Sequence, residues 1–402
     1  MRFVFTALPG SGHIHPMIPG AQALTARGHE VTFATSPASV GYLHKIGFDA
    51  IGVGPEWVEG GDDSISIRLI SLDVPGQLRL FIEIASMGAI TDLLDFFSKR
   101  RPDAVVSEDY EYAGRLAAEL AGVPAATHSV TVRLPRGMSR PIIGPDLLRL
   151  RTSLGLDPDP ELDRVYGQLY LDSVPLSLAL PEARQLPFSH RLRPVVFDTS
   201  GGEGLPLWLD ELPDQPIIYA TLGTVFNRTP RVLEAVIEAM TGEPVTMIVT
   251  TGRNRDPGEL GRLPTNVRAE RYIPQSGLFP RCSAVITHGG FNTLVAALSH
   301  GLPVYFLPLS ADQPWNAQRA VELGFGLSAG ELGPNSIRPV VRAERLDPAQ
   351  IRNAIRRLLS EQSFSRAAAA IRAEIEELPG PDHTADLLER LATEKGPILA
   401  KA

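Results

Sequence analysis

Three stretches of the 402-residue chain could form a catalytic or binding site. In each of them, reactive or polar side chains lie with glycines or acids next to an apolar run. The first, Gly10-Ser11-Gly12-His13-Ile14-His15-Pro16, follows the apolar run RFVFTAL. A neutral imidazole at the carboxyl end of a strand can remove a proton from an attacking hydroxyl group. His13 is therefore a candidate general base, and the alternative is a structural histidine that caps the next helix. His15, directly before Pro16, is expected to be structural.

The second stretch, VVSEDYEY, offers a carboxylate partner for this histidine. A histidine base works best beside a carboxylate that fixes its tautomer and stabilises the imidazolium form. Glu108 is the first candidate and Asp109 the second, both at the end of an apolar run. Because the carboxyl ends of parallel strands share one edge of a sheet, either acid could reach His13. The choice between the two stays open.

The third stretch is AVITHGGFNTLVAALSHGLPVYFLPLSADQPWNAQ. Its first apolar run leads into His288-Gly289-Gly290, and Asn292 and Thr293 open the following helix. The unpaired N–H groups and the positive end of the helix dipole suit a diphosphate. His288 could add a hydrogen-bond donor to the diphosphate, and Thr293 could add a hydroxyl group. Asp312 and Gln313, after the next apolar run, could bond the hydroxyl groups of a sugar.

A dinucleotide-binding fingerprint is not present. Gly10 and Gly12 have the right spacing, but position 15 is His where a third glycine belongs. The second apolar run ends at Thr35-Ser36 without the acid that would hold a ribose. A nicotinamide or flavin enzyme is therefore disfavoured.

The elements around these stretches alternate between strand and helix in two series, over residues 2–130 and 216–309. Short apolar runs between helices are typical of parallel sheets covered on both faces. Between the series, residues 160–174 have a helical pattern, and 176–180 and 193–200 are predicted strands. The fold class expected is α/β, with two Rossmann-like domains facing each other across a cleft.

The length of 402 residues supports two domains rather than one core. We expect an N-terminal domain over residues 1–200 and a Gly/Pro-rich linker over 201–216. A second domain is expected over 217–380. Residues 381–402 are expected to form a C-terminal helix and tail that pack back toward the N-terminal domain.

Composition excludes several classes. The net charge of -8 disfavours nucleic acid as a partner. Cys282 is the only cysteine, so no intramolecular disulfide can form and a reducing compartment is expected; its apolar surroundings favour packing over catalysis. There is no apolar run of ~20 residues and no basic leader, so we expect a cytoplasmic protein without an integral membrane segment. A homodimer is left open.

The sequence resembles the GT-B glycosyltransferases of family 1, particularly the actinomycete-type natural-product glycosyltransferases. The resemblance covers essentially the whole chain and is carried by GSGHIHP, YATLGT, YIPQ and HGGFNT…HGLP…DQPWNA. It implies inverting transfer of a (deoxy)sugar from a nucleotide-diphosphate donor to a small-molecule aglycone, without a metal or other cofactor. A nucleotide-sugar epimerase and a silent nucleotide-sugar-binding auxiliary protein on the same scaffold are the alternatives.

The resemblance also assigns residues. It places the catalytic base at His13, with Glu108 or Asp109 beside it, and an acceptor-binding role in the N-terminal domain. The donor site expected comprises Gly12, Thr224, Pro274, Gln275, His288, Gly289, Gly290, Asn292, Thr293, Asp312 and Gln313.

One departure from the family bears on the nucleotide. Plant members carry a glutamate eight residues after the motif histidine, where it bonds both ribose hydroxyls, and Ala296 stands at that position here. An apolar residue cannot make this contact, whereas a deoxyribose has no 2′-hydroxyl to bond. dTDP-sugars are therefore the expected donors, with UDP-sugars as the alternative.

Acceptor recognition is expected in the irregular parts of the first half, about 56–90 and 130–170. The arginines of TVRLPRGMSRP and LLRLRTSL are interpreted as a solvated basic face. An acidic acceptor or a membrane-surface contact is the alternative for this cluster.

Overall fold

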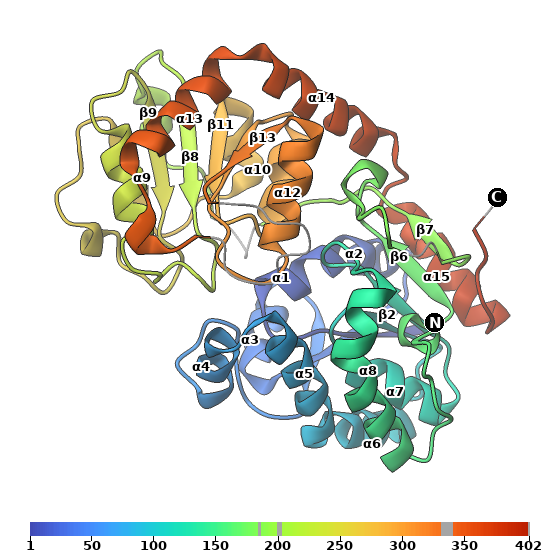
Figure 1. Cartoon of the computed structure of the whole chain (residues 1–402). Helices are drawn as coiled ribbons and strands as arrows, with labels where there is room; N and C mark the ends of the chain where they lie inside the picture. Colours follow the sequence, from blue (N-terminus) through green and yellow to red (C-terminus); the bar gives the residue numbers. More distant parts are fainter. Residues whose placement is uncertain (184–185, 199–202, 331–340, 401–402) are drawn as a thin grey trace. The chain divides into compact units, whose positions relative to one another are not determined.

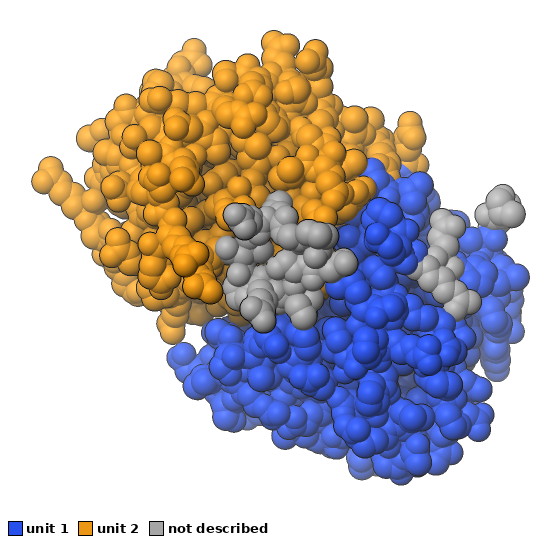
Figure 2. Space-filling view, viewed as in Figure 1, with its two compact units in different colours: residues 1–201, 378–402 blue, residues 202–377 orange. Residues whose placement is uncertain are grey.

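The computed structural model describes residues 1–183, 186–198, 203–330 and 341–400 (Figure 1). The chain divides into two compact units, which Figure 2 distinguishes by colour. Unit 1 comprises residues 1–201 and 378–402, and unit 2 comprises residues 202–377.

Unit 1 contains a seven-stranded parallel sheet in the spatial order β3-β2-β1-β4-β5-β6-β7. Its strands are β1 Arg2–Thr6, β2 Glu30–Thr35, β3 Asp49–Gly52, β4 Ala104–Glu108, β5 Ala125–His128, β6 Leu169–Asp172 and β7 Ser189–Arg191. Its α-helices are α1 Ser11–Ile14, α2 Ile18–Ala26, α3 Pro37–Lys45, α4 Ser64–Ser71, α5 Val74–Ile84, α6 Ile90–Lys99, α7 Tyr112–Ala121, α8 Arg136–Ser153 and α15 Pro381–Glu394.

Unit 2 contains a six-stranded parallel sheet in the order β10-β9-β8-β11-β12-β13. Its strands are β8 Ile217–Thr221, β9 Thr246–Thr250, β10 Val267–Glu270, β11 Ala284–Thr287, β12 Val304–Phe306 and β13 Gly326–Ser328. Its α-helices are α9 Val232–Met240, α10 Gln275–Leu278, α11 Phe291–Ser299, α12 Gln313–Leu323, α13 Pro348–Ser360 and α14 Gln362–Glu377.

The central strands are apolar because helices cover both faces of each sheet. Phe3 and Phe5 of β1 are 1% exposed, and Val105 and Val106 of β4 are fully buried. Burying a side chain of this size contributes on the order of 1.5–3 kcal/mol. The last helix, α15, adds Leu388 and other side chains to the same core by packing on α2 (Figure 1). The C-terminal segment is thus part of unit 1.

Three of the predicted elements are wrong. Residues 160–174, predicted helical, contain the short 3-10 helix Arg164–Tyr166 and the strand β6. Gly167, at φ +68°, lies so close to β5 that a Cβ atom there would be 2.3 Å from the Ala125 carbonyl oxygen. The positive φ interrupts the helical pattern and starts the strand.

Residues 176–180, a predicted strand, contain a 3-10 helix, Leu176–Leu178, that begins after Pro175. The described part of the predicted strand 193–200 has no regular structure, and the edge strand β7 comes earlier, at Ser189–Arg191. Part of the predicted linker, residues 203–216, belongs to unit 2 and contains the 3-10 helix Leu207–Glu211. Residues 201–202 and 199–200 lie outside the described residues.

Each sheet has one point where the strand order reverses. In unit 1 it lies between β1 and β4, and in unit 2 between β8 and β11. The loops that leave the carboxyl ends of these strands diverge there, which opens space for a ligand in proteins of this type. Across the ranges that the structure describes, no helix is both long and apolar enough to cross a membrane.

Candidate active site

The reversal point of unit 1 brings His13 and Glu108 together. His13 lies in α1, directly after β1, and Glu108 is the last residue of β4. Nδ1 of His13 is 3.1 Å from Oε1 of Glu108, an ion-pair distance, although the two groups are not aligned as a hydrogen bond. Such misalignment is common before substrate binds. The predicted pairing of a histidine with an acid across the two strand ends is therefore present.

Backbone groups and charge fix the Glu108 carboxylate. It is fully buried, and its Oε2 accepts a hydrogen bond of 2.8 Å from the Tyr110 N–H. Burial alone would raise the pKa of Glu108, but His13, the Tyr110 amide and Arg115 outweigh it and lower this pKa. Glu108 is therefore an ionised partner for the imidazole.

Asp109, the other candidate acid, makes its hydrogen bonds elsewhere. Its carboxylate accepts hydrogen bonds from the Tyr170 hydroxyl at 2.9 Å and from the Val130 N–H at 3.0 Å. Burial, with the nearby charge of Glu108, raises the pKa of Asp109 to about 7. Asp109 thus links β4 to neighbouring segments, while Glu108 faces the histidine.

A second carboxylate near His13 has no sequence signal. Oε1 of Glu59 lies 3.8 Å from Nε2 of His13, on the side of the ring opposite Glu108. Phe81 and Tyr110 approach the same ring edge-on, with centroids 6.1 Å and 6.4 Å away. Burial opposes the charged imidazolium, but the two carboxylates together raise the pKa of His13 well above its ordinary value.

Arg115 of α7 was also missed from the sequence. Its guanidinium donates hydrogen bonds to the carbonyl oxygens of Glu108, at 2.6 Å, and of Asp109, at 3.0 Å. It therefore fixes the backbone that carries both acids. A buried arginine inside a helical pattern gives no hint of this contact, because only the packing of α7 against β4 creates it.

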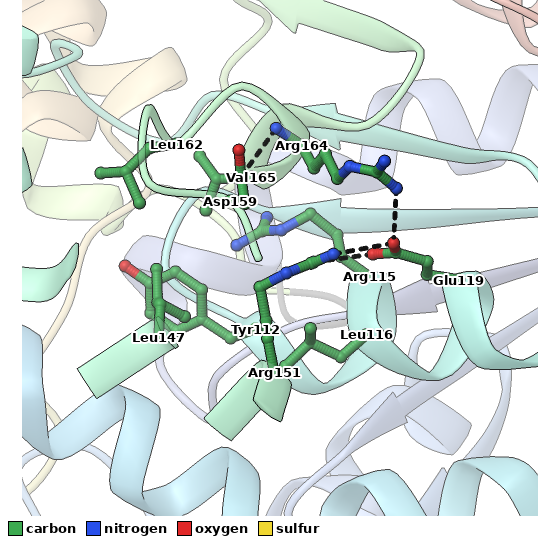
Figure 3. A pocket seen from close by; sticks show the side chains of 10 residues that line it. All are labelled: Tyr112, Arg115, Leu116, Glu119, Leu147, Arg151, Asp159, Leu162, Arg164 and Val165. Atoms are coloured by element: carbon green, nitrogen blue, oxygen red, sulfur yellow. Dashed lines mark hydrogen bonds and ion pairs between the residues drawn. The ribbon is translucent and has the colours of Figure 1, made fainter. Parts of the chain in front are cut away.

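Arg115 also lines a pocket beside α7 and α8 (Figure 3). The polar groups of this pocket bind one another: Glu119 pairs with Arg151 at 2.8 Å and with Arg164 at 3.0 Å. Four of the arginines in the predicted basic face are also ion-paired: Arg136 with Asp163, Arg140 with Glu161, Arg149 with Asp146 and Arg151 with Glu119. The pocket is therefore a structural ion-pair cluster.

In unit 2 the reversal point brings the loops after β8 and β11 around His288. A Cβ atom on Gly223, at φ +71°, would be 2.6 Å from Cε1 of His288, and one on Gly290 would be 2.7 Å from Nε2. The ring is thus held between two glycine backbones. Burial lowers the pKa of His288 to about 4, so its imidazole is neutral at neutral pH and can donate one hydrogen bond.

The first turn of α11 follows directly. The residue before it, the N-cap Gly290, has no side chain, and among the described residues no side chain caps this end of the helix. The N–H groups of the first turn and the helix dipole therefore favour an anion there. Nε2 of Gln275 lies 3.4 Å from Oγ1 of Thr293, which brings two predicted donor-site residues together. Pro274 precedes Gln275 and is buried.

Asp312 and Gln313 follow β12 and differ in their surroundings. Asp312 accepts a hydrogen bond of 2.8 Å from Asn316, which also donates to the Gly289 carbonyl, so Asp312 is tied to the glycine loop. Gln313 is 2% exposed, and its Oε1 accepts hydrogen bonds from the N–H groups of Leu309 and Ser310. Gln313 thus shapes the turn.

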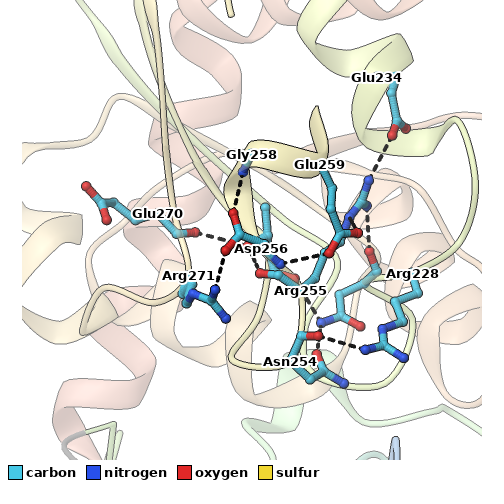
Figure 4. A network of polar contacts seen from close by, with 11 residues as sticks. Arg228, Glu234, Asn254, Arg255, Asp256, Gly258, Glu259, Glu270 and Arg271 are labelled. Atoms are coloured by element: carbon cyan, nitrogen blue, oxygen red, sulfur yellow. Dashed lines mark hydrogen bonds and ion pairs between the residues drawn. The ribbon is translucent and has the colours of Figure 1, made fainter. Parts of the chain in front are cut away.

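A polar network supports the loops after β8 and β9 (Figure 4). Arg255, 7% exposed, donates hydrogen bonds to the Asn227 carbonyl and to Glu234 of α9, each at 2.8 Å. Asn227 in turn donates to the Thr251 carbonyl at 2.8 Å. The network holds the loop that contains Gly223 and the exposed Thr224 against its neighbour.

The predicted site residues thus fall into two groups. Gly12, His13, Glu108 and Asp109 belong to unit 1, and the remaining predicted donor-site residues belong to unit 2.

Cys282 is partly buried, and burial raises the pKa of its thiol to about 12, as expected for a packing residue. Within the described ranges, no group of three or more His, Cys, Asp or Glu side chains is placed to hold a metal ion.

Comparison with known proteins agrees with this layout. Residues 234–391 match the family described as erythromycin biosynthesis protein CIII-like, C-terminal domain, and residues 21–155 match the glycosyl transferase 4-like domain. The 4'-demethylrebeccamycin synthase of Lentzea aerocolonigenes is 28% identical, covering 97% of this chain and 99% of its own. The tylactone mycaminosyltransferase of Streptomyces fradiae is 29% identical, covering 97% and 92%.

Solved structures show the same fold. The glycosyltransferase VinC in complex with dTDP superimposes with a TM-score of 0.80 at 25% identity, covering 98% of this chain and 100% of its own. SnogD from Streptomyces nogalater has a TM-score of 0.75 at 28% identity, covering 98% and 99%.

Two parallel Rossmann-like sheets and these relatives define a glycosyltransferase of the GT-B fold. The chain is such an enzyme, and its predicted resemblance to the natural-product glycosyltransferases of actinomycete antibiotic pathways is confirmed.

Proposed function

We propose that the enzyme transfers a sugar from a dTDP-sugar to a hydroxyl group of a small-molecule aglycone with inversion of configuration. The observation that carries the proposal is the His13–Glu108 pair at the reversal point of unit 1. His13 removes the acceptor proton through Nε2, and Glu108 stabilises the imidazolium that forms. The acceptor oxygen bonds to the anomeric carbon as the bond from that carbon to the diphosphate breaks.

The leaving diphosphate is held on unit 2. Its charge is stabilised by the N-terminus of α11, with a hydrogen bond from neutral His288 and the hydroxyl of Thr293. Asn292, Thr224 and the backbone of Gly289 and Gly290 complete the contacts proposed for the phosphates. Asp312 bonds the donor sugar, while Gln313 holds the turn that carries it. In this scheme no metal or other cofactor takes part.

The choice of dTDP rests on Ala296 and on a relative. Ala296 is fully buried in α11 and offers the ribose no polar group. VinC, which has the same fold over the full chain, was crystallised with dTDP. The named relatives include an aclacinomycin-T 2-deoxy-L-fucose transferase, which supports a deoxygenated sugar on a natural-product aglycone.

The direct test is acceptor-dependent release of dTDP. The protein is incubated with dTDP-sugars and a panel of polyketide and aromatic aglycones, and the nucleotide and the glycoside are measured together. The proposal expects equimolar dTDP and β- or α-glycoside of inverted configuration, with neither product formed by H13A. A product with retained configuration, or conversion of the donor without an acceptor, would overturn it.

A further inference from the structure

The loop that follows β3 brings a second carboxylate to His13. Oε1 of Glu59 is 3.8 Å from Nε2 of His13, which is an ion-pair distance longer than a hydrogen bond. Both side chains are largely buried, with exposed fractions of 17% for Glu59 and 12% for His13. The contact is therefore shielded from water, and its electrostatic effect exceeds that of a surface pair.

The backbone holds Glu59 in this place. Its N–H donates a hydrogen bond of 2.9 Å to the carbonyl of Pro9, in the loop that leads from β1 to His13. Before it, buried Trp57 donates its N–H to the Ser36 hydroxyl. After it, Asp63 accepts hydrogen bonds from two N–H groups at the start of α4. The loop is thus anchored on both sides of Glu59.

Gly10 leaves the space that the Glu59 carboxylate occupies. A Cβ atom at residue 10 would lie 2.0 Å from Oε2 of Glu59 and 3.0 Å from its Cδ. The φ of Gly10 is −143°, an ordinary extended value, so its backbone does not require glycine. The missing side chain at residue 10 therefore has a steric use, which is to admit this carboxylate.

The two nitrogens of His13 consequently face two acids. When Nδ1–H points to Glu108, Nε2 of neutral imidazole is an acceptor, and an ionised carboxylate can give it no proton. Glu59 therefore favours the imidazolium form, in which Nε2 also carries a proton. Of the other groups around the ring, Tyr110 meets it edge-on, and Arg115 binds the backbone of Glu108.

We propose that Glu59 is a positioning residue that holds His13 in its protonated form until an acceptor hydroxyl displaces the carboxylate from Nε2. On displacement, the extra proton leaves Nε2 for solvent, and the neutral ring can then take the proton of the acceptor. This inference rests on the proposed role of His13. It makes base activation dependent on acceptor binding.

The test is a titration of the His13 ring by NMR in the full chain without substrates, assigned with H13Q. E59Q is expected to lower the pKa of His13 by at least half a unit relative to wild type. E56Q removes an exposed acid from the same loop and is expected to leave the titration unmoved. G10A keeps the charge but pushes the carboxylate aside, so it should lower the pKa in the same direction as E59Q. An unchanged titration in both E59Q and G10A would overturn the proposal.

Activity gives a second readout. The acid limb of kcat/KM is expected to move to lower pH in E59Q, so that the ratio of rates at pH 6 and pH 9 rises several-fold. An acid limb that stays in place in E59Q would contradict the proposal. Full turnover by H13Q would instead contradict the base assignment, and the NMR titration would still report on Glu59, so the two failures are distinguishable.

Discussion

Oε1 of Glu108 lies 3.1 Å from Nδ1 of His13, across the two strands between which the order of the first sheet reverses. β1 and β4 are direct neighbours in register, with Thr6 opposite Ser107, so the residues after them meet at one edge. Buried strands fix this edge more rigidly than loops alone could. The two side chains therefore lie within ion-pair distance before any substrate binds.

Replacing the histidine should separate catalysis from donor binding. H13Q is expected to lower kcat by about 10²–10⁴-fold, because the acceptor hydroxyl loses its base. Binding of dTDP should change by less than about twofold, since the proposed phosphate contacts lie in unit 2. Steady-state kinetics and calorimetry on the same preparation provide both numbers. Turnover within a few-fold of wild type would remove His13 from the role of base.

The two neighbouring acids offer a matched comparison. E108Q removes the charge that faces His13 and should reduce kcat by about 10²-fold, with the acid limb of kcat/KM at lower pH because the pKa of His13 falls. D109N changes the acid that binds Tyr170 and Val130 and should leave that limb in place. pH–rate profiles of both variants show which acid is the partner of His13. A shifted acid limb in D109N, with the limb of E108Q in place, would identify Asp109 as the partner.

Asp109 should instead affect stability as a function of pH. Its folded-state pKa is about 7, above its ordinary value, so folding favours the protonated acid. The resulting stability is present at low pH and is lost as pH rises toward 7. The side chain of D109N stays neutral at every pH. The difference in free energy of unfolding between D109N and wild type should therefore shift in favour of D109N by on the order of 3 kcal/mol from pH 4 to pH 8. Urea unfolding at both pH values measures this, and a difference independent of pH would contradict it.

The phosphate site can be tested through the glycine against His288. G223A places a Cβ atom 2.6 Å from the ring and should weaken dTDP binding by about tenfold or more. G242A is the control, because Gly242 has a similar positive φ of +75° with open space around it. Both variants should lose roughly 1 kcal/mol of stability from backbone strain. Equal nucleotide affinity in the two variants would show that the His288 ring is not part of the site.

The strands that carry the site could be predicted because their short apolar runs alternate with helical patterns. Glu108 and His288 lie at or directly after the ends of such runs, and His13 and Thr293 lie in the helices that follow, so their positions could be predicted from the parallel order. Residues 160–174 misled the prediction because a helical spacing of apolar side chains cannot reveal that Gly167 must approach Ala125.

Contacts made by loops and by distant helices could not be predicted. Glu59 reaches His13 because its loop is anchored at Trp57 and Asp63. No pattern of residues in the sequence predicts this path of the loop. Gln313 is predicted to bind sugar, and its amide oxygen also accepts hydrogen bonds from two backbone N–H groups in a turn, a contact that the sequence did not indicate. Whether a polar side chain binds a ligand or a nearby backbone group depends on its position to within a few ångströms. Spacing along the sequence does not specify that position.

The most direct test of the donor site is calorimetric titration of the wild-type protein with dTDP and UDP, side by side. We expect dTDP to bind, and to bind several-fold more tightly than UDP, because the buried Ala296 gives a ribose 2′-hydroxyl no partner. Equal or tighter binding of UDP would contradict the choice of nucleotide. Binding of neither would contradict the nucleotide-sugar site itself.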